Sequence, residues 1–363
     1  MFSRLGGFSQ IRRNLRPSKH LQNSVLEYAY VNARVGALRG YLLKADELSA
    51  LEGSKSLRDY IALLEHTSYR SVFSELAYAD VRSVDNALVR HFLEFTEHLT
   101  MLSPDRVRPI IASASKKYEM GNIKAVLASK AAGEMPESVR ERLYPANEKL
   151  TIRLLGAKDV DEAAMLLASE GFFLVRDRLE AYRDDGNIQP LLAAVDIHHF
   201  IRLWSETERL SGKDERIAKD IIGTDIDTLN LLSILRAKRG GYDAKDYIIP
   251  VAHRINPVLA LKMTAECKTV GETIQALEKS SYHKVLEKGL RYFEDKDSLQ
   301  QFEVELRRHL LRRCRDAMRG SPSNIGTVLG FHRVKEAEVE NLRRIAVCVS
   351  EELPRHELAQ LLT

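Results

Sequence analysis

The stretch from Glu119 to Gly133 reads EMGNIKAVLASKAAG, and two related stretches follow it along the chain. Asp227 to Gly241 reads DTLNLLSILRAKRGG, and Glu338 to Val349 reads EVENLRRIAVCV. In each stretch, which we call the signature, an acidic residue is followed three positions later by asparagine and then by an aliphatic residue. Because self-similarity at a fixed period marks a repeat architecture, we predict three similar units along the chain.

The spacing of the signatures supports this repeat. Asn122 and Asn230 lie 108 residues apart, and Asn341 follows after another 111. Within each signature the aliphatic residues recur at helical spacing, so each asparagine lies beside a buried stripe. Such an amide needs a hydrogen-bond partner. We therefore expect the asparagines to set the register between packed helices, with contact to a partner protein as the alternative.

A second helical element recurs once upstream of each signature. The three copies begin at Leu57, Val160 and Val270. Each keeps one helix face apolar and ends twelve residues later in an aromatic side chain, which we expect to lie in the core. These aromatic residues are Tyr69, Phe172 and Tyr282. The residues just before the three copies are of favoured N-cap types: Ser56, Asp159 and Thr269.

Other helix limits are also signalled locally. Ser24 with Glu27, and Thr224 with Asp227, have the spacing of a capping box, which predicts helix starts at both places. Gly241 is placed to end the second signature helix in a left-handed conformation. A third helix of each repeat is expected to begin near three acidic residues: Asp85, Asp196 and Glu303.

The composition agrees with a helical protein. Of the 363 residues, 29% are charged and 7% aromatic, which favours long amphipathic helices over a β-sandwich. The net charge of +4 is too balanced for a general nucleic-acid binder. Three widely spaced cysteines suggest neither a disulfide framework nor a zinc site, and this usage fits the reducing cytoplasm. No apolar run is long enough to span a membrane.

We expect an all-α fold with a basic N-terminal extension, residues 1–23, which is disordered or outside the core. Three helical repeats follow, at 24–144, 145–250 and 251–363, and prolines punctuate the joints. From the residues alone, the repeats could form an open solenoid or close about a pseudo-threefold axis.

The motifs of catalysis are weak. The chain has no GxxxxGK[ST] phosphate loop and no GxGxxG. His91, Glu94 and His98 have helical spacing, but the second ExxH of a di-metal bundle is missing. Two SxxK matches, at 113–116 and 281–284, lack the accompanying motifs. We therefore expect no catalytic residue, no cofactor and no metal.

A basic cluster occurs between residues 307 and 315, which read RRHLLRRCR. It forms either a solvated helix face or a contact with an acidic partner. Its members are Arg307, Arg308, Arg312 and Arg313.

Three stretches in order make the sequence familiar: YAYVNARVGALRGYLL from Tyr28, DTLNLLSILRAKRGG from Asp227 and VKEAEVENLRRIA from Val334. They resemble the C subunits of archaeal and bacterial A/V-type rotary ATPases, whose eukaryotic counterpart is the d subunit of the vacuolar proton pump. The resemblance covers about residues 24–349, so the basic extension lies outside it.

The resemblance implies a funnel of three helical subdomains about a pseudo-threefold axis, without catalytic activity. Such a protein would be a socket on the cytoplasmic face of the membrane complex, one copy per complex, between the proteolipid ring and the central shaft made of the D and F subunits. It would bind neither nucleic acid nor a small-molecule substrate. For shaft contact we expect the polar edges of the signature helices: Arg236, Lys238, Arg343 and Arg344.

Two alternatives come from other classes of protein. A free-standing helical-repeat scaffold or adaptor for protein or nucleic acid would present a continuous basic stripe, with salt-sensitive binding if nucleic acid is the partner. A metal-containing bundle enzyme would hold stoichiometric metal. Neither explains why the three stretches occur together in this order.

Overall fold

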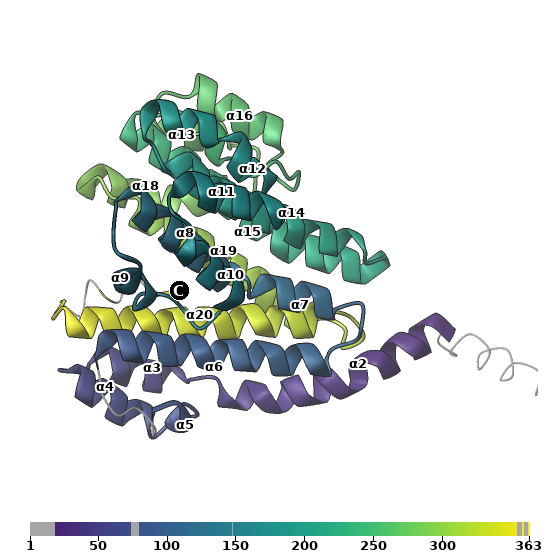
Figure 1. Ribbon diagram of the computed structural model, residues 1–363. Coiled ribbons are helices and arrows are strands. Elements are labelled where there is room, and N and C mark those ends of the chain that lie inside the picture. Colours follow the sequence, from purple (N-terminus) through teal and green to yellow (C-terminus); the bar gives the residue numbers. More distant parts are fainter. Residues whose placement is uncertain (1–18, 74–79, 147, 354–357, 359–361) are drawn as a thin grey trace, which may run out of the picture.

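The computed structural model describes residues 19–73, 80–146, 148–353, 358 and 362–363, and within them every regular element is a helix (Figure 1). The all-α prediction is therefore confirmed. The first part of the chain contains α2 (Lys19–Leu38), η1 (Arg39–Tyr41), α3 (Ala45–Glu52), α4 (Leu57–Leu64), α5 (Arg70–Phe73), α6 (Val81–Leu102), α7 (Arg108–Ala114), α8 (Lys117–Ala131) and α9 (Pro136–Arg140). The second contains α10 (Glu148–Gly156), α11 (Val160–Ser169), α12 (Phe173–Asp177), α13 (Leu179–Asp185), α14 (Gln189–Glu208), α15 (Gly212–Gly240) and η2 (Lys245–Tyr247). The third contains α16 (Pro257–Glu266), α17 (Val270–Gln275), α18 (His283–Lys296), α19 (Gln300–Arg319) and α20 (Gly326–Ser350).

The predicted N-caps are confirmed at the starts of α4, α11 and α17. Each cap side chain accepts a hydrogen bond from the backbone N–H three residues later: Ser56 from Asp59, Asp159 from Glu162 and Thr269 from Glu272. Gly241 follows α15 with a φ of 71°, as predicted for a left-handed C-cap.

Two predicted helix starts are wrong. The chain is already helical at Lys19, so Ser24 lies inside α2. Thr224 lies in the middle of α15, where its hydroxyl donates to the carbonyl of Asp220. This back-bonding to residue i−4 satisfies a threonine inside a helix, so the spacing of a capping box does not by itself stop the helix from running through.

The third helices begin earlier than predicted. α6 starts at Val81, α14 at Gln189 and α19 at Gln300, which is three to seven residues before the acids expected to open them. For α6 the cap is Asp80, whose carboxylate accepts from the N–H of Ser83. The acids themselves lie one or two turns inside, where they pair with signature helices.

Three hydrophobic cores each join the signature helix of one repeat to helices of the next. α8 packs with α10–α14, and α15 packs with α16–α19. α20, at the other end of the sequence, packs with α3–α6, and Figure 1 shows it beside α6. The apolar face of each signature helix is thus covered by a following unit, and the third closes onto the first. The predicted boundaries at 144 and 250 stay a prediction, and the cores cross them.

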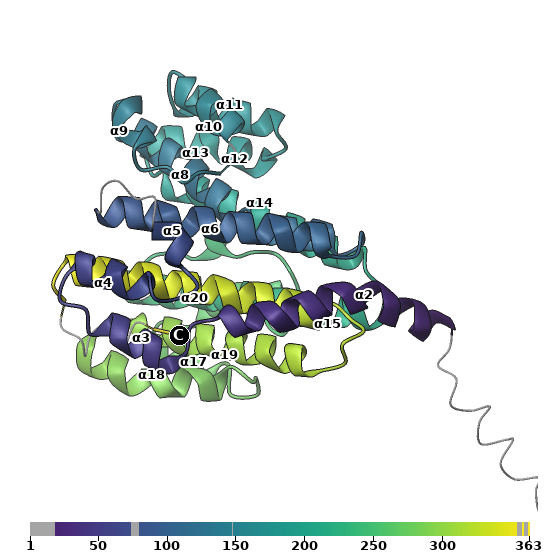
Figure 2. The ribbon, with the colours of Figure 1, turned by 90° about the horizontal axis from the view of Figure 1, so that it is seen from below.

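A fourth, central core joins the three units. It contains side chains from α2, α6, α7, α14, α15, α19 and α20, including Val31, Leu99, Ile110, Ile197, Ile222, Cys314 and Phe331. Viewed from below, these long helices lie in stacked layers and α2 runs outward from them (Figure 2). Residues 1–18 of the predicted extension are outside the described residues, whereas 19–23 belong to α2. Among the helices described, none combines the length and apolarity needed to cross a membrane.

Close contact between α19 and α20 depends on a glycine. A Cβ at Gly330 would lie 2.6 Å from the backbone oxygen of Cys314, so the two helices would have to move apart. We expect Gly330→Ala to lower the free energy of unfolding by about 1–3 kcal/mol, as overpacking does. Gly36→Ala in α2 is the matched control, because no atom lies within 4 Å of its Cβ, and helix propensity predicts a gain of about 1 kcal/mol. Urea denaturation measures both, and equal shifts for the two variants would contradict the packing argument.

Candidate functional site: a charged opening between the three units

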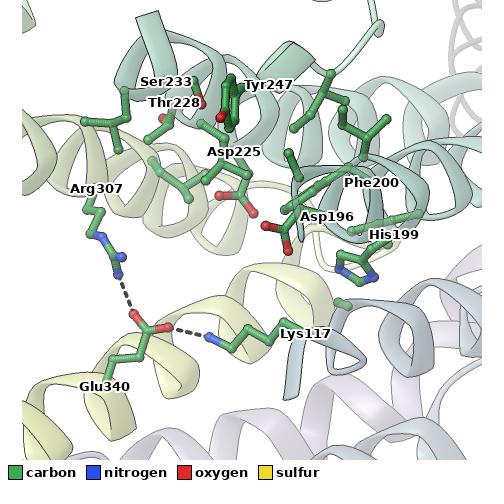
Figure 3. Close-up of a pocket in the computed structure, with 18 of the residues that line it drawn as sticks. Lys117, Asp196, His199, Phe200, Asp225, Thr228, Ser233, Tyr247, Arg307 and Glu340 are labelled. Carbon is green, nitrogen blue, oxygen red and sulfur yellow. Dashed lines mark hydrogen bonds and ion pairs between the residues drawn. The ribbon is translucent and has the colours of Figure 1, made fainter. Parts of the chain in front are cut away.

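A cavity of about 700 Å³ opens where the three repeats meet, and it is lined from α8, α14, α15, α19 and α20. The wall formed by α14 and α15 mixes apolar side chains, among them Leu192, Phe200 and Leu229, with Asp196 and Asp225. The opposite wall carries charges from α8, α19 and α20 (Figure 3). No single repeat contains this opening, so it exists only because the chain closes on itself.

A network of ion pairs crosses the charged wall. Figure 3 shows Lys117 from α8 and Arg307 from α19 both reaching Glu340 on α20. Lys117 also lies 2.8 Å from Glu336, and Arg333 pairs with both Glu336 and Asp225 of α15. The network therefore holds four helices from all three repeats around the opening.

Lys117 and Glu340 stay charged although their side chains are partly buried. Desolvation would lower the pKa of Lys117, but Glu336 and Glu340 outweigh it and raise that pKa above its usual value. Desolvation would likewise raise the pKa of Glu340, but Lys117 and Arg307 hold it well below the usual range. For Asp225, burial prevails over Arg333 and raises the pKa. Because removal of one partner leaves an uncompensated buried charge, such a network makes the arrangement of the helices specific.

Of the four residues expected to contact a shaft, only Arg236 lines the opening. Its side chain is half exposed and pairs with Glu303 at 3.2 Å. The other three are engaged within the chain. Lys238 donates to the carbonyl of Thr264, Arg343 pairs with Asp85 and with the Tyr144 hydroxyl, and Arg344 lies 3.9 Å from Glu303.

The basic cluster on α19 is divided by its partners. Arg307 belongs to the network at the opening, and Arg308 pairs with Glu305 and donates to the carbonyl of Leu362. Arg313 forms a bidentate pair with Asp220 of α15 at 2.7–2.9 Å. Arg312 is exposed. Contact of the cluster with a ring or shaft stays a prediction.

Each signature asparagine binds the backbone of the segment that follows its helix. The Asn122 Oδ1 accepts from the N–H of Tyr144 at 2.8 Å, and its Nδ2 donates to the same residue's carbonyl at 2.9 Å. Asn230 repeats this with Ile249 at 2.8 and 3.1 Å, and Asn341 with Thr363 at 3.2 and 2.8 Å. The partner is thus a connecting segment or the C-terminal residue, where the sequence suggested a neighbouring helix.

The signature acids and the recurring aromatic residues also meet across repeats. The hydroxyl of Tyr282 donates to Asp227 at 2.8 Å, and that of Tyr69 donates to Glu338 at 2.7 Å. Both tyrosines are fully buried, and Phe172 is buried at the third equivalent place. Each acid lies in one repeat and its tyrosine in the next, which is the same cyclic order as the cores.

Sequence reasoning missed a histidine beside each of these aromatic rings. The ring centroids are 5.1 Å apart for His91 and Tyr69, 4.0 Å apart for His198 and Phe172, and 5.5 Å apart for His309 and Tyr282. The signal in the sequence was that a histidine recurs in each third helix. His91, weighed above as a metal ligand, faces a tyrosine, and the described residues contain no group of three or more potential ligands.

Buried histidines predict a loss of stability in acid. Burial lowers the pKa of His91, His199, His309 and His332 to about 4, from 6.5. The unfolded chain therefore binds more protons between these values, so stability is full above pH 6.5 and falls as the pH drops toward 4. Asp227 acts in the opposite sense, because burial raises its pKa to about 6, but it is one group against four.

Urea denaturation at several pH values across this window tests the expectation. The free energy of unfolding should decline from about pH 6.5 downward. The decline should be shallower in His309→Phe, which removes one of the four groups. A free energy that is constant or rises on acidification would contradict the assignment of these histidines as neutral.

The fold and the opening define a class of protein: a closed helical-repeat body built around a charged recess. The sequence comparisons make this specific. The family model described as ATP synthase (C/AC39) subunit matches residues 31–361, so the chain belongs to that family.

Relatives from several archaea are similar over most of their length. The A-type ATP synthase C subunit of Methanothermobacter thermautotrophicus is 30% identical, over 88% of this chain and 83% of the relative. The C subunit of the A-type ATP synthase of Methanocaldococcus jannaschii is 28% identical, over 92% and 86%. That of Pyrococcus abyssi is 23% identical, over 92% and 90%.

Proposed function

We propose that this chain is the non-catalytic coupler in the central stalk of an A/V-type ATP synthase or ATPase. In this role one copy sits peripherally on the cytoplasmic face of the membrane complex. It joins the rotating shaft, made of the D and F subunits, to the proteolipid ring. Torque then passes through it between ATP turnover and ion translocation.

The observation that carries this proposal is the opening bounded by all three repeats. A shaft tip seated there would touch every unit at once, so a turning force would be shared among the three cores. A torque coupler needs stiffness, and close-packed helices that form one closed body supply it. The lining mixes apolar and charged side chains, as protein interfaces do.

Co-elution tests the role directly. The purified chain is mixed with the D–F shaft of its own organism and, separately, with the detergent-solubilised ring. Binding to both, with one copy in the ternary assembly, is the expected result. Binding to neither by a folded, helical chain would overturn the socket assignment and favour a free-standing scaffold.

Arg236 provides the sharpest variant, because it is the predicted contact that lines the opening and is half exposed. We expect Arg236→Glu to weaken D–F binding by about tenfold or more, since a like-charge contact at an interface costs over a kcal/mol. Arg239→Glu is the control: it lies on the same helix, pairs with an acid in the same way, and is outside the opening. Equal affinities of the two variants would exclude Arg236 from the shaft contact.

A further inference from the structure

The three junctions between repeats are built alike, but one differs in chemistry. At two of them, a tyrosine hydroxyl from the next repeat donates to the signature acid: Tyr69 to Glu338 and Tyr282 to Asp227. At the junction between the first two repeats the acid is Glu119 and the aromatic residue is Phe172, which has no hydroxyl. The hydrogen bond from an aromatic hydroxyl to the signature acid, present at the other two junctions, cannot form here.

The residues around Phe172 also differ from their equivalents at the other two junctions: they include cations that are exposed. Lys335 lies three positions before its signature acid, is buried, and donates to both Tyr69 and Glu338. Lys116 has the same position before Glu119, but it is exposed. On the third helices, histidine follows the repeat's acid by six residues at His91 and His309. The equivalent position on α14 is an exposed arginine, and the histidine lies one turn earlier: these are Arg202 and His198.

A second pocket, of about 330 Å³, lies at this junction. Its charged and titratable lining comes from α8, α10 and α14 and from the residues just before α8 and just after α11: Lys116, Glu119, Lys149, Arg153, Glu170, His198, His199 and Arg202. Arg153 pairs with Glu170. The side chains of Lys116, Lys149 and Arg202 form no ion pair or hydrogen bond with any residue that the structure describes. Four permanent cations therefore face two carboxylates.

The excess of positive charge affects the pKa of His198. Burial lowers its pKa, and Arg202 and Lys116 lower it further. Its ring is stacked on Phe172 at a centroid distance of 4.0 Å, which fixes its place in the pocket. An anion bound among the cations would oppose both neighbours, so it would raise the pKa of His198.

We propose that this pocket binds a phosphate-type oxyanion, held by Lys116, Lys149 and Arg202. The pocket is a hollow in which cations from different segments converge, which suits a small, multiply charged group better than an extended partner. The phosphate can be a free solute or the headgroup of an anionic lipid, because the same atoms would be recognised in both. Lys116, Lys149 and Arg202 do not line the opening proposed for the shaft, although His199 lines both pockets.

The first test titrates the purified chain with inorganic phosphate and follows the His198 ring by NMR, with His198→Gln to assign its signals. We expect a saturable shift with a dissociation constant of about 1 mM or tighter, and a higher pKa of His198 at saturation. The double variant Lys116→Ala with Arg202→Ala should weaken binding by about tenfold or more, since each removes a charge-assisted contact. Both residues are exposed, so the variant should keep its fold.

The control removes the same charge elsewhere. Arg312→Ala with Arg315→Ala also deletes two exposed cations, outside the pocket, and should leave phosphate binding unchanged. Equal weakening by both doubles, or no saturable shift of His198 in the native chain, would overturn the proposal. Lys149→Ala gives a second, independent variant with the same expected direction.

Vesicles distinguish the two sources of phosphate. Phosphatidylcholine vesicles with and without phosphatidylglycerol are co-sedimented with the chain. A lipid headgroup would be assigned if the chain binds the anionic vesicles, if the Lys116/Arg202 double variant does not, and if inorganic phosphate competes with the vesicles. Phosphate binding without such vesicle binding would assign a soluble anion. An acidic peptide that leaves the phosphate-induced shift of the His198 signals unchanged would be excluded as the occupant of this pocket.

Discussion

Arg333→Met is expected to lower the free energy of unfolding by about 3–5 kcal/mol, because it leaves Asp225 without its ion-pair partner and Glu336 with Lys117 alone. Arg333 pairs with both Asp225 and Glu336, and its own side chain is 13% exposed. Desolvation would lower the pKa of Arg333, but the two acids raise it above its usual value. Methionine keeps much of the apolar stem and removes the charge. Urea denaturation monitored by circular dichroism measures the change.

The control is Arg319→Met, whose pair with Asp316 is largely exposed. Exposed pairs contribute about 0–1 kcal/mol, so this variant should be nearly neutral. Adding Asp225→Leu to Arg333→Met should recover part of the loss, since it removes the carboxylate that has lost its ion-pair partner. If Arg333→Met were as mild as Arg319→Met, the network would not organise the opening.

Asn230→Leu is expected to cost about 1–3 kcal/mol, because it leaves the buried N–H of Ile249 without a partner, whereas the carbonyl of Ile249 keeps the N–H of Val251. Asn230 is fully buried, and its amide holds both the N–H and the carbonyl of Ile249. Leucine has the same branched arrangement of side-chain heavy atoms and is larger, so the substitution opens no cavity, and hydrogen exchange can assign the loss to the unpaired N–H. Hydrogen exchange at the Ile249 amide gives a local measurement beside the global one.

The third signature offers a matched comparison. Asn341 makes the same two bonds to Thr363, but that residue is partly exposed, so water can replace the amide. Asn341→Leu should therefore cost less than Asn230→Leu. The reverse order would mean that the asparagines stabilise the fold by some route other than holding the following segment.

Local sequence features predicted local structure well. The N-caps Ser56, Asp159 and Thr269 form the expected bonds because a cap involves only residues three apart. The same reasoning was wrong at Thr224, where a capping-box spacing occurs inside a long helix. A buried helix is held by packing on several sides, and this packing overrides a local stop signal.

The candidate sites were much less predictable. Arg236 and Arg343 both belong to signature helices and look alike in sequence. In the structure Arg236 lines the opening, while Arg343 is held by Asp85 from a position 258 residues away. A partner so distant along the chain leaves no local signal. The second pocket combines side chains of α8, α10 and α14, which only the packing of the repeats brings together.

The sequence by itself determined that the chain is helical, that three related stretches occur along it, and which asparagines and aromatic residues recur. These follow from helical periodicity and short-range capping, which a chain carries in any context. Only the tertiary structure decided that each signature helix completes the core of the next unit, and that Tyr69 meets Glu338 across 269 residues. The opening is lined by side chains of all three repeats, and the second pocket by side chains of the first two. Both therefore arise only when whole repeats pack against one another, which no local sequence pattern specifies.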